Sequence, residues 1–177
     1  MNIEKADYAT IVKFGTLVDL KMKLSIEKKD IFSIINWKDN KGISILEHSI
    51  ISRNFVISKY LLNHDAEVNV VSEDGCNEFH YLAPSIDDEG ALEIAELLLV
   101  KGTSLTQKEK KYGNTALFSL CLESLKRRLD NTMLFIQKCL KESINYEEQN
   151  NSGISIKQLI SERGTNELKM VLEEKYE

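Results

Sequence analysis

The three histidines of the chain, His48, His64 and His80, have the readiest chemistry, because imidazole serves both as a general base and as a metal ligand. Either use needs acidic or cysteine partners brought close on one face. Glu47 beside His48 and the acidic run 87–89 suggest acid–base catalysis. Carboxylates adjacent in sequence, however, usually belong to a solvated turn. These residues alone therefore do not define a catalytic site.

The motifs of common active sites are missing from the sequence. It has no Gly-x-Ser-x-Gly elbow, no phosphate-binding loop and no His-Glu-x-x-His motif. Cys76, Cys121 and Cys139 are odd in number, far apart and without Cys-x-x-Cys spacing, which indicates reduced thiols in the cytoplasm rather than a disulfide framework or a zinc site. We therefore expect no enzyme, with no catalytic residue, no cofactor and no metal.

Four glycines, Gly42, Gly75, Gly113 and Gly153, recur at gaps of 33, 38 and 40 residues. Each follows an apolar–polar pair and precedes a short run with helical spacing. A period near 33 residues is typical of helix-pair solenoids, because one pair cannot bury its own apolar face. The four apolar–polar pairs are Ile35-Asn36, Val68-Asn69, Leu105-Thr106 and Ile144-Asn145.

Apolar residues at helical spacing predict a helix that closes each unit. Gly102 is expected to end the second of these helices in the left-handed conformation, and Gly164 divides two short helices of a charged last unit. An earlier stretch, 14–24, resembles a lone second helix. The predicted core residues are Leu17, Leu20 and Leu24; Phe55, Ile57, Leu61 and Leu62; Leu92, Ile94, Ala95, Leu98 and Leu99; Met133, Phe135, Ile136, Cys139 and Leu140; and Leu168, Val171 and Leu172.

These units resemble ankyrin repeats, whose pattern is a glycine turn, a Thr-Pro-Leu-His-like helix start and a Leu-Leu-x-x-Gly-Ala-x-x-Asn close. The segments 61–69 (LLNHDAEVN) and 97–106 (LLLVKGTSLT) match the close, and the likeness covers about residues 14–172, although no unit has the proline. The matches at the helix start are Ser44 and Leu46 in GISILEHS, Phe79 and His80 in GCNEFHYLA, and Thr115 and Leu117 in GNTALFSL.

The resemblance implies an all-α fold, an ankyrin repeat solenoid of stacked helix pairs with short β-hairpin or hairpin-like loops and about four to five repeats including caps. It also implies that His80 orders a hairpin, whereas His48 and His64 are expected at exposed or semi-exposed helix positions. The expected single domain, 1–177, divides into an N-terminal cap (1–35), three repeats (36–69, 70–106 and 107–145) and a C-terminal cap (146–177).

Two units exceed the usual repeat length. Pro84 and the residues after it, 84–90, predict a longer link between paired helices, because proline cannot continue a helix. We expect 122–131 (LESLKRRLDN) to lengthen the next link, with its basic cluster 126–128 on a solvated helix face. Loop insertions cost little stability and often lie on a working face, although neutral drift explains them equally well.

The composition favours one soluble, acidic domain. The net charge of −5 and pI near 5.4 argue against nucleic-acid binding, which needs a face rich in lysine and arginine. No apolar run has membrane-spanning length, and the first residues lack the basic start and apolar stretch of a secretory signal. We therefore expect a cytoplasmic protein with no nucleic-acid or membrane partner.

A solenoid of this kind binds proteins on the concave face formed by its first helices and hairpin tips. Residues next to the glycines need not serve the core, so they are the candidate contacts. They are Trp37, Asp39, Asn40 and Lys41; Glu73, Asp74 and Cys76; Lys111, Tyr112 and Asn114; Asn150, Asn151 and Ile154; and, on the first helix, Ile51 and Ser52.

Trp37 and Tyr112 are the strongest candidates, because rim aromatics supply contact area at low entropic cost. Packing of Trp37 under its hairpin, beside Ile34 and Ile35, is the alternative. Several carboxylates would make the tips largely acidic, interrupted by the lysines of 108–111, and an acidic ridge suits a basic partner. These carboxylates are Asp39, Glu73, Asp74, Glu147 and Glu148.

The resemblance therefore implies a non-enzymatic protein–protein interaction module that is a monomer when free. Small bacterial proteins of this kind include immunity proteins, so we expect a chain that binds and occludes a cognate toxin, with a basic toxin domain as partner. The alternatives are an adaptor or effector that recruits a host or regulatory protein, and an enzyme on a repeat scaffold.

Overall fold

The computed structural model describes residues 1–142 and 145–174, and over these residues it is all-helical, with no β-strand. Ile144, from the last apolar–polar pair, lies outside the described residues. The helices are α1 (Tyr8–Phe14), α2 (Leu17–Glu27), α3 (Ile45–Ile51), α4 (Phe55–Asn63), α5 (Glu78–Leu82), α6 (Ala91–Val100), α7 (Ala116–Arg127), α8 (Asp130–Glu142), α9 (Ile156–Arg163) and α10 (Asn166–Glu173), with 3₁₀ turns η1 (Ile31–Ser33) and η2 (Ala83–Ser85).

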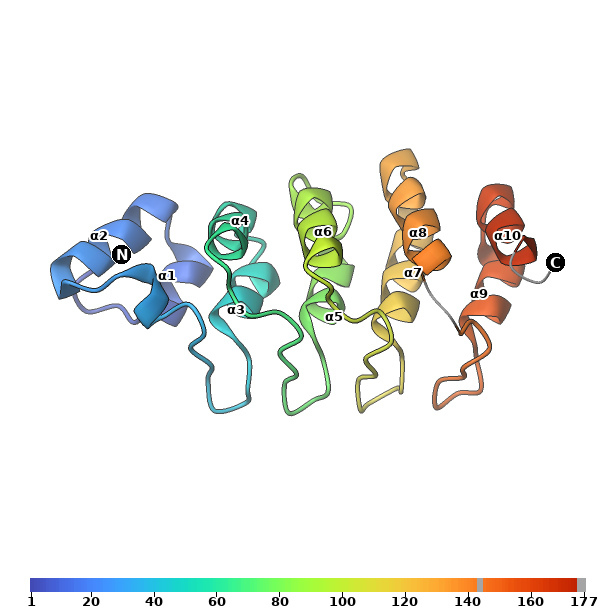
Figure 1. Ribbon diagram of the computed structural model, residues 1–177, viewed down its shortest axis with the longest axis horizontal. Coiled ribbons are helices and arrows are strands. Elements are labelled where there is room, and N and C mark those ends of the chain that lie inside the picture. Colours follow the sequence, from blue (N-terminus) through green and yellow to red (C-terminus); the bar gives the residue numbers. More distant parts are fainter. Residues whose placement is uncertain (143–144, 175–177) are drawn as a thin grey trace.

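The helices form a row of pairs whose order in space is their order in the chain (Figure 1). Each odd-numbered helix contacts the even-numbered helix that follows it. The first helices α1, α3, α5, α7 and α9 also contact one another in succession, as do the second helices α2, α4, α6, α8 and α10. The row is therefore two layers deep, with α1 and α2 at one end and α9 and α10 at the other.

The residue two positions after each recurrent glycine caps the N-terminus of a helix. The four glycines have positive φ, and the following polar side chain accepts a hydrogen bond from the backbone N–H three residues further on, which satisfies a donor that the first helical turn leaves free. These caps are Ser44, Asn77, Thr115 and Ser155. The spacing Gly-x-(Ser/Asn/Thr) thus fixes the start of α3, α5, α7 and α9.

The loops that precede these helices project from the same side of the row (Figure 1) and are joined by backbone hydrogen bonds. The N–H of Glu73 donates to the Lys41 carbonyl, that of Lys110 to the Asp74 carbonyl and that of Asn151 to the Tyr112 carbonyl, each at 2.8 Å. The acceptor is always the residue before a recurrent glycine. The four tips are therefore held at fixed spacing.

Asparagines that close the units bind the next unit. Asn69 Oδ1 accepts from the Ser104 N–H at 2.6 Å and its Nδ2 donates to the Gly102 carbonyl at 2.9 Å, while Asn36 Oδ1 accepts from the Glu67 N–H at 3.0 Å. Gly102 has φ of +79°, as predicted. These side-chain bonds fix the register between neighbouring units.

The predicted core is confirmed. All the named core residues are buried except Leu17 and Leu92, which are half-buried and pack against the core. Gly164 separates α9 from α10, as expected. The N-terminal segment has one helix more than the sequence predicted, because Asp7 caps α1 by accepting a hydrogen bond from the Thr10 N–H at 2.7 Å.

The prediction for 84–90 is confirmed and that for 122–131 is wrong. At Pro84 the helix α5 ends in the turn η2, and α6 begins only at Ala91. By contrast, α7 continues to Arg127, so the extra residues lengthen a helix and leave only 128–129 as the link to α8. The segment contains no glycine or proline and is rich in leucine, glutamate, lysine and arginine, which are strong helix formers.

Replacing Gly75 by alanine tests the close packing of the tips. A Cβ on Gly75 would lie 2.8 Å from the Lys108 carbonyl oxygen of the next loop, and its φ of +80° is already unfavourable for alanine. We expect Gly75→Ala to lower the free energy of unfolding by about 2–4 kcal/mol. Gly102→Ala is the control, since its φ is +79° with nothing within 4 Å, and should cost about 1 kcal/mol. Equal losses in urea titrations would contradict the packing argument.

Candidate protein-binding groove

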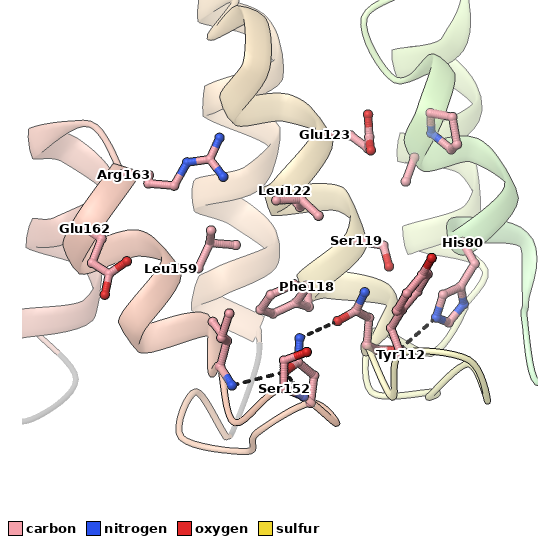
Figure 2. Close-up of a pocket in the computed structure, with 15 residues that line it drawn as sticks. His80, Tyr112, Phe118, Ser119, Leu122, Glu123, Ser152, Leu159, Glu162 and Arg163 are labelled. Atoms are coloured by element: carbon pink, nitrogen blue, oxygen red, sulfur yellow. Dashed lines mark hydrogen bonds between the residues drawn. The ribbon is translucent and has the colours of Figure 1, made fainter.

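A groove of about 510 Å³ lies along the first helices α5, α7 and α9, beside the last two loop tips (Figure 2). Most of its lining surface is apolar, although about half of the lining residues are polar or charged, and such a mixture is usual for a binding cleft. The lining residues are His80, Ala83, Pro84, Tyr112, Asn114, Phe118, Ser119, Leu122, Glu123, Asn150, Ser152, Ile154, Leu159, Glu162 and Arg163.

Helix α7 supplies the centre of the groove. Phe118 and Leu122 are one turn apart on this helix, and Leu159 of α9 lies across from them (Figure 2). Phe118 and Leu159 are buried, whereas Leu122 is half-buried and packs on the edge of the core. The groove floor is therefore an outward continuation of the core.

The side chains of Glu109 and Asn150 fix the position of the rim that the loop tips form. Glu109 accepts hydrogen bonds from the backbone N–H groups of Lys111, Tyr112 and Asn114 at 2.7–3.1 Å. Asn150 Nδ2 donates to Asn114 Oδ1 at 2.8 Å. These bonds hold the backbone of the tip that carries Tyr112, and 52% of this residue is exposed.

His80 lies on the wall of the groove and uses both ring nitrogens internally. Nδ1 accepts from the Asn77 N–H at 3.2 Å and Nε2 donates to the Asn114 carbonyl at 3.2 Å. Burial lowers its pKa, so the ring is neutral at pH 7. This bonding pattern agrees with the hairpin-ordering role predicted for His80 and leaves neither nitrogen free to act as a base.

Charged side chains lie at the rim of the groove that is farther from the loop tips. Glu123 bonds Lys126 at 2.5 Å and Glu162 accepts from Gln158 Nε2 at 2.9 Å, while the Arg163 side chain extends over the groove (Figure 2). An apolar floor with ionic groups at one edge suits a protein segment that presents an apolar side chain beside polar ones.

The candidate residues fall into three groups in the structure. Tyr112, Asn114, Asn150 and Ile154 line the groove. Ile51 and Ser52 are at the C-terminal end of α3, where the Ser52 N–H donates to the His48 carbonyl, and Cys76 is half-buried with its pKa raised to about 11 by burial. The remaining exposed candidates, on the tips but outside the groove, are Trp37, Asn40, Lys41, Glu73, Asp74, Lys111 and Asn151.

Trp37 is 45% exposed, and its ring centroid lies 6.1 Å from that of His48. Its neighbours Ile34 and Ile35 are buried. The indole thus presents a large apolar surface on the first tip, at some distance along the row from Tyr112, so the structure does not bring the two strongest candidates into one site.

Asp39 and His48 differ from their predicted positions. His48 is buried rather than exposed, and its Nε2 lies 3.0 Å from Asp39 Oδ2. The other carboxylate oxygen of Asp39 accepts from the N–H groups of Lys41 and Ile43 at 2.8 and 3.0 Å. Although burial opposes it, this bonding holds the pKa of Asp39 below its usual value. Asp39 is therefore directed inward and stabilises its loop. His64 is half-buried, with Nδ1 2.8 Å from the Tyr60 carbonyl, as its predicted semi-exposed position allows.

The expected acidic ridge loses Asp39, and two of its other members form ion pairs with lysines at the surface. Besides Asp39, Glu147 pairs with Lys157 at 2.6 Å and Glu148 with Lys108 at 2.8 Å. Glu73 and Asp74 remain exposed on their tip. The exposed carboxylates of the tips are thus Glu73 and Asp74, together with Glu147 and Glu148 in their ion pairs.

The residues that the sequence did not indicate are mainly those of the apolar groove floor. Phe118 lies in the motif GNTALFSL, and Leu122 follows this motif by two residues. In the sequence, the apolar character of both residues indicates core positions. A leucine four residues after phenylalanine, on a helix that already has a full apolar face, is a signal that could have indicated the second apolar surface.

Comparison with protein-family models found no match, and a search of the curated proteins found no relative. Across 1–142 and 145–174, no three His, Cys, Asp or Glu side chains gather closely enough to hold a metal ion. Over the same residues, no helix combines the length and apolar character needed to cross a bilayer. The case for a function therefore depends on the geometry of the groove.

Outside the groove, two carboxyl groups are fully buried between α3 and α5. Glu78 is satisfied, because its oxygens accept from the N–H groups of Asn69 and Val70 at 3.1 and 3.0 Å. Glu47 Oε2 accepts from the Ser44 N–H at 2.7 Å, but its Oε1 is buried without a partner. Burial, reinforced by the charge of Glu78 and opposed by the bond from Ser44, raises the pKa of Glu47 to about 8.

Glu47→Gln tests this raised pKa. A carboxyl group whose pKa rises from 4.5 to about 8 on folding stabilises the fold at low pH, and this contribution is lost as pH rises toward 8. Relative to Glu47→Gln, the wild type should lose about 2–4 kcal/mol of unfolding free energy between pH 5 and 8. The comparison removes the histidine contributions, which are common to both proteins. Parallel pH profiles in urea unfolding would show that Glu47 is ionised in the fold.

Proposed function

We propose that this chain is a non-enzymatic protein-binding module of the ankyrin repeat type, and that the groove along α5, α7 and α9 is its main contact surface. The ankyrin repeat solenoid is supported by the row of helix pairs in chain order, by the glycine two residues before each of four helix caps, and by the asparagines that close the units. The single observation that carries the binding role is the apolar groove, whose floor of Phe118, Leu122 and Leu159 extends the core to the surface.

The groove is better suited to bind a protein partner than to catalyse a reaction. The imidazole of His80 is bonded at both nitrogens, and the carboxylates of Glu123 and Glu162 are bonded to Lys126 and Gln158 at the rim. An open apolar floor beside a rigid aromatic side chain favours the binding of an apolar side chain from a folded partner. Tyr112 would contribute contact area without losing much freedom, because hydrogen bonds from its backbone N–H to Glu109 hold its loop.

The cellular role that we propose is that of a bacterial immunity protein, acting in the cytoplasm to bind and occlude a cognate toxin. The partner would be a toxin domain held against the groove, with Trp37 and Tyr112 as contacts at two tips. Apolar contacts on the groove floor would supply most of the affinity, because exposed ion pairs contribute little. Glu73 and Asp74 would assist the encounter with a basic toxin surface.

The role is tested by co-expression with the product of the adjacent reading frame. The proposal expects a tight one-to-one complex and survival of cells that die when that product is expressed alone. A neighbouring product that is harmless, or that kills in the presence of this chain, would remove the immunity role and leave the binding role to be tested separately.

Substitutions in the groove test the binding surface. Leu122→Asp places a charge on the floor and should weaken partner binding about 100-fold or more, whereas Tyr112→Ala should weaken it about 10-fold. Calorimetric titration measures both effects, and circular dichroism checks that each variant is folded. Val100→Asp, at an exposed position at the end of α6, is the matched control and should bind as the wild type does. Undiminished binding by folded Leu122→Asp would place the interface elsewhere.

A further inference from the structure

Two arginines lie at the rim of the groove that is farther from the loop tips. Arg163 lines the groove, and Arg128 donates to the Arg163 carbonyl at 3.0 Å. The chain has two other arginines, Arg53 and Arg127, whose nitrogens lie 3.0 and 4.0 Å from carboxylate oxygens of the acidic run 87–89. In the part of the chain that the structure describes, Arg128 and Arg163 pair with no carboxylate. Their charges are therefore available to an anionic group from outside the chain.

Arg128 holds the end of α9 against α7. Its Nη2 makes the bond to the Arg163 carbonyl, and its Nε donates to the Leu125 carbonyl at 3.4 Å. The Arg163 carbonyl belongs to the last turn of α9, where carbonyl groups have no acceptor role left within the helix. Because Arg128 satisfies this carbonyl, the Arg163 guanidinium is not needed there and extends over the groove (Figure 2).

The two carboxylates of this rim do not pair with Arg163. Glu162 points in a different direction from Arg163 (Figure 2), and Glu123 is bonded to Lys126 of its own helix. Leu159 lies one turn before Arg163 on the same face of α9. A partner that covers Leu159 on the groove floor thus passes directly beside a guanidinium group.

Other polar groups beside the floor are suited to hold the backbone of a bound segment. Asn114 Oδ1 accepts from Asn150 Nδ2 at 2.8 Å, and Asn114 Nδ2 has no acceptor within 1–142 and 145–174. The hydroxyl of Ser119, which follows Phe118 on α7, also makes no hydrogen bond within these residues. An amide donor and a hydroxyl next to an apolar floor match the carbonyl groups of a peptide segment.

We propose that the groove binds a segment of the partner protein that carries an apolar side chain for the floor and a carboxylate for the Arg163 guanidinium. This rests on the proposed function, in which the groove is the contact surface. The two groups of the segment must lie about one helical turn, or roughly 5 Å, apart, as Leu159 and Arg163 do on α9. The partner can still be basic overall, because Glu73 and Asp74 are exposed on another tip.

The carboxylate would determine specificity more than affinity. An arginine holds a carboxylate by two parallel N–H···O bonds, which fixes the direction of the bound segment. The exposed ion pair itself contributes little to affinity. A lysine or arginine at the same place in the segment, however, would be repelled by Arg163 and Arg128. The groove should therefore select acidic segments and reject basic ones.

Selection from a library of random linear peptides displayed on phage tests this specificity. Peptides that bind the immobilised wild type should share an apolar residue and an aspartate or glutamate at one fixed spacing. Peptides selected on Arg163→Glu should carry lysine or arginine at the acidic position instead. Lys5→Glu is the matched control, since it changes the net charge equally at an exposed position in the N-terminal segment, and should select the same peptides as the wild type.

The affinity of one selected peptide, measured by calorimetric titration, completes the test. Arg163→Glu should weaken binding about 10-fold, and replacing the acidic residue of the peptide by lysine should restore it. Circular dichroism checks that the variants are folded. Peptides that need Leu122 but share no acidic residue, or that bind Arg163→Glu as well as the wild type, would overturn this inference and leave the groove as a binding surface. If no selected peptide is lost in folded Leu122→Asp, the groove is not a binding surface and the proposed function fails with the inference.

Discussion

The structure depends on the fact that no helix pair can bury its apolar surface alone. Each pair of helices is short, and its core side chains are covered on both sides only because the neighbouring pairs supply the rest, as where the ring of Phe79 on α5 lies 6.5 Å from that of Phe135 on α8. Successive pairs must therefore approach closely. This requirement explains the glycine at position 75, where the next loop leaves no room for a side chain.

The same close approach determines how polar groups are used. Loops brought together this tightly bury backbone donors and acceptors, which need partners. Glu109, Asn150 and Asp39 satisfy them from within the loops, and Asn69 does so between units. Some side chains that look like surface charges in the sequence therefore stabilise the loops. The surface that remains for a partner is the apolar groove along the first helices, together with the few aromatic residues at the tips.

Much of the fold could be predicted from the sequence, because glycine spacing, helix caps and apolar periodicity are local signals that agree with one another. The end of α7 was predicted wrongly, because the usual repeat length suggests that extra residues lie in a loop, whereas 122–127 has no glycine or proline and is rich in strong helix formers. The inward position of Asp39 was also not predictable, since it depends on His48 in the next helix. For the site, the sequence indicated Tyr112, Asn114 and Asn150 through their place beside the glycines. It did not indicate Leu122, because a pattern of apolar residues does not distinguish a core face from a groove beside it.

The hydrogen bonds between loop tips, which join each loop to the next, have a mechanical consequence. A force that pulls the two ends of the row apart acts on the interfaces in series, so the same tension reaches each of them and their extensions add. Such a molecule stretches as a soft spring and yields first at its weakest joint. A bound partner that spans α5, α7 and α9 would bridge two of these joints and stiffen that half of the row.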